Sequence, residues 1–243
     1  MIAMLIKTRG IVLNYIKYRE TSIIARVYTE RLGLQTYIVN SVRKAKPPGR
    51  IALFQPFTLL DLVAYTSRQG GIARLSEYRC AIPFSTLPYN VHKSSVVLVL
   101  SEIVGRVLLE EEENEPLFNF LHDSILAFDQ QPAGFENFAL DFLLHLAGYL
   151  GFGIESGAEV TSQVAFATAA PATSAAGNGP AALRFREFDH YFDELLRDPL
   201  HSTIPNGRIR RELLDVLIRY YQLHVEKLGD IRSLAVLSEV LAD

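Results

Sequence analysis

A short polar stretch between two apolar segments concentrates positive charge. It contains Arg43, Lys44, Lys46 and Arg50, and the prolines and glycine at positions 47–49 indicate a loop. Cations gathered on one connection suit phosphate groups, because much of the affinity of proteins for nucleic acids comes from neutralising phosphates. The stretch is therefore a candidate contact for a polyanion.

More basic residues precede this loop, and tyrosines lie between them. Aromatic faces can stack on bases while cations hold the phosphates, which is how small barrels bind single strands. We expect at least half of Tyr15, Tyr18, Tyr28 and Tyr37 to serve in the core or in cross-strand pairs instead. The cations are thus the candidate DNA contacts: Arg9, Lys17, Arg19, Arg26, Arg43, Lys44, Lys46 and Arg50.

Charge is distributed unevenly along the chain. Residues 1–80 contain 13 lysines and arginines and four acidic residues, a formal charge of +9. Residues 81–243 contain 11 lysines and arginines and 23 acidic residues, a formal charge of −12. A small β domain can be basic for solubility alone, but so large an excess in so few residues favours a polyanionic partner.

The segments that carry these cations have the alternating pattern of strands. Ile23, Ala25 and Val27 fall on one face of their segment, as expected for a half-buried strand. Five such strands without a long helix predict a closed barrel, the five-stranded oligonucleotide-binding (OB) fold. The expected strands are 5–16, 21–29, 34–42, 57–64 and 72–80.

A change of period after Pro83 and Pro88 indicates helices, so the chain is expected to be α+β. We predict an OB-fold DNA-binding domain over residues 1–80 and an all-helical domain over 81–243. The stretch 156–182 is rich in Ala, Thr, Ser, Gly and Pro and has almost no charge. Such a composition offers little surface to bury, and we expect a flexible insertion there.

The sequence offers little for other chemistries. One cysteine, Cys80, and six scattered histidines provide no four-ligand zinc set, so neither a metal nor a cofactor is expected. His145 lies in an apolar segment and is expected to be a hydrogen-bonded core histidine. Nucleotide-binding and nucleophile motifs are missing, which gives catalysis no positive support. The N-terminal apolar stretch is too short for a signal-peptide core, no segment is apolar enough to span a membrane, and we expect a cytoplasmic protein.

Ordered motifs along nearly the whole chain resemble the RecO family of recombination mediators. Each motif is weak alone, and their number and order carry the resemblance. They are Thr8–Leu13, Tyr18–Glu20, Tyr28–Glu30, Val42–Lys46, Phe54–Phe57, Glu111–Phe118, Phe142–Tyr149 and Tyr220–Leu237.

The resemblance implies binding of single- and double-stranded DNA, annealing of complementary strands, and no nucleotide hydrolysis. It implies partnership with the RecR protein to load the RecA recombinase onto DNA coated by single-stranded DNA-binding protein. Many relatives carry a four-cysteine zinc module after the landmark that ends at Tyr149, whereas residues 151–182 contain no cysteine. The resemblance therefore implies a zinc-less member.

The resemblance also implies that the acidic C-terminal tail of the single-stranded DNA-binding protein docks on the helical half. Such a tail needs cations beside an apolar groove. Leu213, Leu214, Leu217 and Tyr221 share a helix with three arginines and are the expected groove. The candidate cations are Arg106, Arg208, Arg210 and Arg211, although they can equally neutralise nearby acids.

Two other classes of function stay open at this point. The first is a non-catalytic interaction scaffold whose basic barrel binds an acidic protein partner; it predicts no salt-dependent binding of mixed-sequence single-stranded DNA. The second is an enzyme whose site has no familiar motif; it predicts several buried polar groups that converge in one pocket.

Overall fold

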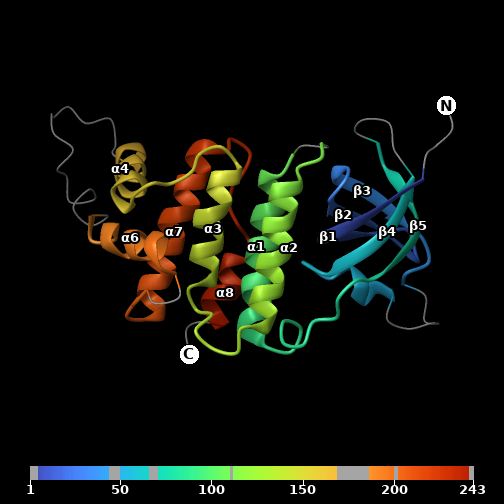
Figure 1. The fold of residues 1–243 in the computed structure, drawn as a ribbon, viewed down its shortest axis with the longest axis horizontal. Coiled ribbons are helices and arrows are strands. Elements are labelled where there is room, and N and C mark those ends of the chain that lie inside the picture. Colours follow the sequence, from blue (N-terminus) through green and yellow to red (C-terminus); the bar gives the residue numbers. More distant parts are fainter. Residues whose placement is uncertain are drawn as a thin grey trace. The chain divides into compact units, whose positions relative to one another are not determined.

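The computed structural model describes residues 5–43, 50–65, 71–109, 112–168, 186–199 and 202–240 (Figure 1). The chain forms two compact units. The first contains the residues up to Gln130 together with Ile231–Leu237, and the second contains Gln131–Asp230 and Ser238–Asp243. The chain therefore leaves the first unit and returns to it for a short segment near its end.

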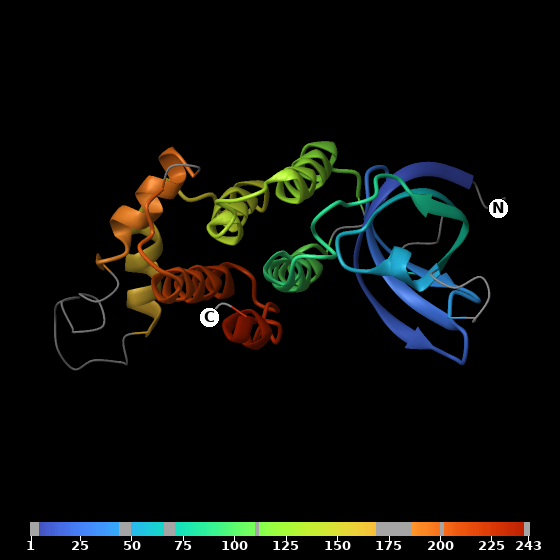
Figure 2. The ribbon, with the colours of Figure 1, turned by 90° about the horizontal axis from the view of Figure 1, so that it is seen from below.

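Five strands of the first unit form a closed barrel (Figure 2). Their order around the barrel is β1-β2-β3-β5-β4, and only the β3–β5 pair is parallel. This is the OB topology that the sequence predicts. The elements are β1 (Leu5–Tyr18), β2 (Ser22–Thr29), β3 (Gly33–Val39), the 3-10 helix η1 (Arg50–Phe54), β4 (Leu59–Tyr65) and β5 (Ala73–Cys80).

Alternate residues of the strands fill the barrel, because successive side chains of a strand point to opposite faces. Gly10 of β1 is buried against this core. A Cβ atom there would lie 2.7 Å from Cδ1 of Leu62 and 2.8 Å from Cγ1 of Val27, so a larger residue would require these side chains to move. The core consists of Val12, Ile23, Ala25, Val27, Tyr37, Val39, Val42, Phe54, Leu60, Leu62, Ala64 and Ala73.

Two long helices of the first unit follow the barrel, α1 (Val91–Val107) and α2 (Glu115–Gln130), and the last helix, α8 (Leu234–Val240), begins in the segment that returns to this unit. Asn90 caps α1, since its side-chain oxygen accepts hydrogen bonds from the backbone N–H groups of His92 and Lys93. The ring of Phe118 on α2 stacks on Tyr28 of β2, with centroids 6.3 Å apart. The domain boundary predicted near residue 80 is thus the end of the barrel, while the first helices group with the barrel in one compact unit.

Buried apolar side chains on four helices form the core of the second unit. The hydroxyl of Tyr221 donates a hydrogen bond of 2.6 Å to the carbonyl oxygen of Leu143 and joins two of these helices. Phe142, Leu146 and Leu217 are buried around this contact. The helices are α3 (Phe138–Tyr149), α4 (Gly157–Thr168), α6 (Asp189–Arg197) and α7 (Gly207–His224).

The flexible insertion predicted at 156–182 is wrong for its first part, which forms α4. Val160 and Val164 lie one turn apart and are both buried, so the helix does have an apolar face to pack. Gly157 is needed at its start, because a Cβ atom there would lie 2.0 Å from the carbonyl oxygen of Asp189. Residues 169–182 lie outside the described residues.

Candidate nucleic-acid interface

A β-bulge in β1 decides which of its side chains face outward beside β2. The pairing register shifts between Val12 and Asn14. Before the bulge Val12 points into the core, whereas after it Asn14 lies opposite Arg26 on the outside. Because side chains alternate, Ile16 and Tyr18 lie on the outer face as well.

Cross-strand pairing extends this outer face over β2 and β3. The pairing of β3 with β5 places Arg74 beside Ile38 at the far end of one row. In the third row the Ser22 hydroxyl donates a 3.1 Å hydrogen bond to the side-chain oxygen of Asn40. In order along β1, the three rows are Asn14–Arg26–Thr36, Ile16–Ile24–Ile38 and Tyr18–Ser22–Asn40. We call this surface the isoleucine face; none of its side chains is acidic.

Three predicted DNA contacts gather at the end of the barrel next to this face. The backbone N–H of Arg43 donates to the carbonyl oxygen of Thr21, and its guanidinium donates to that of Arg19 at 3.2 Å. Arg19 has a left-handed backbone φ of 51° and places its guanidinium 5.1 Å from the ring centre of Tyr18. Lys17 precedes this turn and is exposed. Lys17, Arg19 and Arg43, with Arg74 of β5, are the basic rim.

Two other predicted contacts have internal partners. Arg9 donates hydrogen bonds of 3.0 and 2.7 Å to both carboxylate oxygens of Glu30 and one of 3.1 Å to Asn119 of α2. The hydrogen bond to Glu30 raises the pKa of Arg9 and lowers the pKa of Glu30. Arg26 donates to the carbonyl oxygen of Gly105 at 2.8 Å, and burial lowers the pKa of Arg26. Both side chains therefore fasten helices to the barrel.

Three further predicted contacts are Lys44, Lys46 and Arg50. Lys44 and Lys46 lie outside the described residues. Arg50 begins η1 and is exposed. Burial raises the pKa of the Tyr78 hydroxyl on β5, and the positive charge of Arg50 opposes this rise. Arg50 thus lies beside β5.

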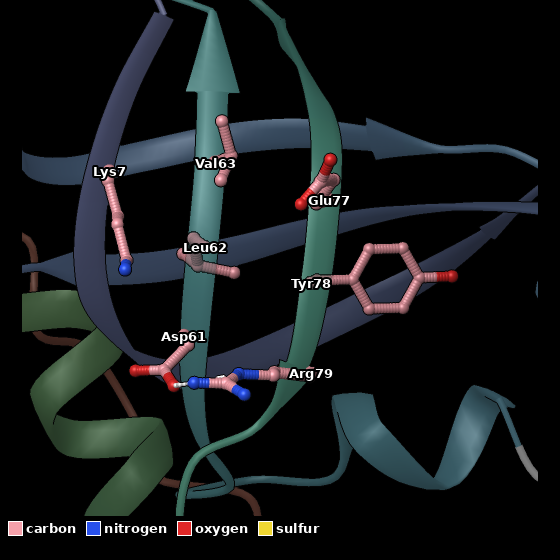
Figure 3. Close-up of a pocket in the computed structure, with 7 residues that line it drawn as sticks. All are labelled: Lys7, Asp61, Leu62, Val63, Glu77, Tyr78 and Arg79. Atoms are coloured by element: carbon pink, nitrogen blue, oxygen red, sulfur yellow. Dashed lines mark hydrogen bonds and ion pairs between the residues drawn. The ribbon is translucent and has the colours of Figure 1, made fainter.

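The outer surface of β1, β4 and β5 carries balanced charge. A pocket of about 440 Å³ lies there (Figure 3). The guanidinium of Arg79 donates hydrogen bonds of 3.0 and 2.8 Å to Asp61, and Lys7 and Glu77 lie on either side of Val63. Two cations, Lys7 and Arg79, and two acids, Asp61 and Glu77, line this pocket, so the surface is less suited to a polyanion than the basic rim.

Sequence reasoning identified part of this site and missed part. Tyr28 and Tyr37 are buried and Tyr15 packs against the barrel core, which confirms that at least half of the four tyrosines are structural. The isoleucines of the face and Arg74 were missed. Alternation in β2 separates Ile24 from Val27, but the rows depend on strand register, which a single strand does not reveal.

The apolar groove predicted on α7 does not exist, because its side chains are core. Leu213, Leu214, Leu217 and Tyr221 are all buried in the second unit. The helix is an ordinary amphipathic helix, whose leucines pack into the core while arginines lie on its other faces.

The four cations predicted for the same partner site are mostly engaged in internal contacts. Arg106 forms an ion pair with Glu102 on α1, within the first unit. Arg210 donates hydrogen bonds of 2.9 Å to Asn137 and 3.2 Å to the carbonyl oxygen of Ile204. Arg208 is exposed and approaches Glu212 at 3.8 Å, and Arg211 lies on the same helix, α7.

His145 is exposed, and its prediction as a core residue is wrong. Its Nδ1 lies 2.9 Å from the carbonyl oxygen and 3.0 Å from Oδ1 of Asp141, one turn earlier on α3. The hydrogen bond with the Asp141 carboxylate raises the pKa of His145 to about 9. The described residues contain neither a group of three His, Cys, Asp or Glu side chains placed to hold a metal ion nor a helix with the length and apolarity to cross a membrane.

The fold places the chain among proteins that join an OB barrel to a helical region. Its sequence matches the family models of the recombination protein O N terminal over residues 1–84 and C terminal over residues 88–235. It is 34% identical to the DNA repair protein RecO of Flavobacterium psychrophilum and 31% identical to that of Phocaeicola vulgatus, over 98% of this chain and 100% of each relative. It is 40% identical to the RecO protein of Bacteroides fragilis over 61% of either chain.

The chain therefore belongs to the RecO family of DNA repair proteins. The two matches together cover nearly the whole chain, so the barrel and the helical region both belong to the family pattern.

Proposed function

We propose that this protein is a non-catalytic recombination mediator that binds single- and double-stranded DNA through the barrel. The basic rim would hold phosphates, and Arg50, Lys44 and Lys46 would make further phosphate contacts. The observation that carries this proposal is the contrast between two barrel surfaces. Arg19, Arg43 and Arg74 border the isoleucine face, whose rows contain no acidic side chain, whereas Arg79 is paired with Asp61 on the other surface.

Membership of the family supports a role in DNA repair, and the finer steps are part of the proposal. We propose that the protein anneals complementary strands in the cytoplasm and, with RecR, helps to load RecA onto DNA coated by single-stranded DNA-binding protein. The acidic tail of that coating protein would need an accessible cation. Arg208 is the first residue to test for this contact, since its side chain is 78% exposed.

The DNA site is tested with a triple variant of the basic rim, Arg19→Ala, Arg43→Ala and Arg74→Ala. Fluorescence anisotropy with single-stranded and duplex oligonucleotides at several salt concentrations gives the affinity and its salt dependence. Phosphate contacts carry no base information, so all sequences should lose affinity alike. The salt slope should become shallower by about 0.7–0.9 for each lost contact.

Lys7→Ala is the matched control, because Lys7 is an exposed barrel cation on the charge-balanced surface. It should bind DNA like the wild type. Wild-type affinity in the triple variant would show that the basic rim is not the site. A wild-type protein that binds neither DNA form would contradict the proposed function itself. Annealing of complementary strands coated with single-stranded DNA-binding protein then tests the mediator role.

A further inference from the structure

Three isoleucines form a continuous apolar row on the outside of the barrel. Ile16 of β1 pairs with Ile24 of β2, which pairs with Ile38 of β3. Strand neighbours lie about 4.8 Å apart, so the row is about 10 Å long. Ile16 is 62% exposed, and the other two are half-buried. The adjacent row is covered where Arg26 meets α1, but the isoleucine row lies beyond that contact.

Cations lie on two sides of this row. Arg74 pairs with Ile38 at its end on β5. Tyr18 is two residues from Ile16 along β1, about 7 Å away. The guanidinium of Arg19 lies over the ring of Tyr18. A ligand that covers the isoleucines would therefore meet positive charge at both sides and no acid within the rows. Charge complementarity calls for an anion that also has an apolar part.

Single-stranded DNA has this combination of properties, whereas duplex DNA does not. In a single strand the bases are free to leave their stack and can pack their faces on a protein surface. In a duplex the faces stay stacked, and the outside presents phosphates and sugars. Phosphate contacts at the rim are available to both forms, but contacts between bases and an apolar row are available only to the single strand.

We propose that the isoleucine row makes this face select single-stranded over duplex DNA. The proposal rests on the proposed function, since it requires that the face binds DNA. The rim supplies affinity for either form. The row adds affinity for unstacked bases, with Tyr18 as the neighbouring aromatic ring. Strand preference is thus built from aliphatic side chains placed in register by the bulge in β1.

The test is the double variant Ile16→Thr and Ile38→Thr in the full-length chain. Threonine keeps the branched shape that suits a strand and removes most of the apolar contact. Ile24 in the centre stays, which preserves the half-buried middle of the row. Anisotropy with a labelled oligothymidylate and with a hairpin duplex gives two dissociation constants. We expect the first to rise about tenfold, the second to change by less than about twofold, and the salt slope to stay constant.

Leu5→Thr is the matched control. Leu5 is 50% exposed on the same strand, but it pairs with Tyr65 of β4 on the charge-balanced surface. It should bind both DNA forms like the wild type. Circular dichroism and thermal unfolding show whether each variant keeps its fold, and a destabilised double variant is replaced by Ile16→Thr alone, whose side chain is largely exposed.

The outcomes separate this inference from the proposed function. Loss of single-strand affinity alone supports it. Equal loss for both DNA forms, or no loss, overturns it while DNA binding by the wild type stands. If the double variant binds oligothymidylate normally but loses affinity for a synthetic helical peptide of Glu, Ala and Leu, the row docks acidic protein and the inference is wrong.

Discussion

The side-chain amine of Lys93 donates a hydrogen bond of 3.2 Å to the main-chain carbonyl oxygen of Asp129. The Asp129 carboxylate in turn accepts hydrogen bonds of 2.8 Å from the backbone N–H groups of Ser85, Thr86 and Leu87. The segment that leaves the barrel is therefore fixed to α2 by an anion that receives three successive amides. Lys93 completes the arrangement from α1 by donating to the Thr86 hydroxyl at 2.8 Å.

This anion should make folding stability sensitive to acid. Burial alone would raise the pKa of Asp129, but the backbone hydrogen bonds outweigh it and lower the pKa from 3.8 to about 2. A carboxyl with a depressed pKa contributes stability that is present above pH 3.8 and lost as the pH falls toward 2. We expect Asp129→Ala to lower the free energy of unfolding at neutral pH by about 3 kcal/mol, because it leaves buried donors without an acceptor.

Urea unfolding of wild type and variant between neutral pH and pH 2 measures both effects. The difference between the two proteins should shrink toward the acid end of this range, since the wild type loses its anion there. Asp123→Ala is the control, because Asp123 lies on the same helix with a side chain that is 77% exposed. A difference that is constant down to pH 2 would mean that the charge of Asp129 does not matter.

The ring of Tyr37 fills the barrel core, but its hydroxyl has no hydrogen-bond partner in the described part of the chain. An unsatisfied buried hydroxyl costs free energy in the folded state. We expect Tyr37→Phe to leave the free energy of unfolding unchanged or to raise it by about 1 kcal/mol. Tyr37→Ala removes the ring as well and should lower it by about 3–5 kcal/mol.

Denaturant titration of the two Tyr37 variants separates the hydroxyl from the ring. A clear loss of stability in Tyr37→Phe would show that the hydroxyl is satisfied in solution, and the expectation would then fail.

Much of the barrel could be predicted from its sequence, because alternation places Ile23, Ala25 and Val27 on one face of their strand, and this face lies in the core. The isoleucine face could not be predicted. It depends on a bulge between Val12 and Asn14, which exchanges the inward-facing and outward-facing side chains in the rest of β1. Nothing in a single strand marks that shift, since the residues on both sides of it are equally compatible with a strand.

The same limit applies to charges. The sequence identified Arg9 and Arg26 as cations near the basic loop, but their roles depend on Glu30 and on Gly105, distant in sequence. Composition also misled at α4, where a run of Ala, Thr and Ser concealed Val160 and Val164 at helical spacing. Two buried side chains on one face were enough, because the neighbouring helices supply the rest of the core.

Glu102 of α1 holds the segment with which the chain returns to the first unit. Its carboxylate accepts hydrogen bonds from the backbone N–H groups of Arg232 at 3.1 Å and Ser233 at 2.9 Å. Glu102→Ala should release these two amides, while buried Ile231 and Leu237 keep the segment in place. We expect hydrogen exchange at Arg232 and Ser233 to become about tenfold faster.

Exchange measured by NMR or by mass spectrometry of short peptides resolves this local effect. Glu226→Ala removes an exposed acid nearby in sequence to the same segment and should leave both amides as protected as in the wild type. Unchanged protection in Glu102→Ala would mean that the apolar contacts alone hold the segment.

His145 should carry a positive charge at neutral pH, although it lies in the acidic half of the chain. Its hydrogen bond with Asp141 raises its pKa from 6.5 to about 9. The contribution of the pair to stability is therefore complete below pH 6.5 and is lost as the pH rises through about 9.

NMR titration of the imidazole protons should give a midpoint near 9 in the wild type, and Asp141→Asn should move it back toward 6.5. Glu136→Gln removes an exposed charge just before α3 and should leave the midpoint unchanged, because the imidazole of His145 contacts Asp141. A wild-type midpoint near 6.5, or one that stays near 9 in Asp141→Asn, would show that Asp141 does not hold this proton.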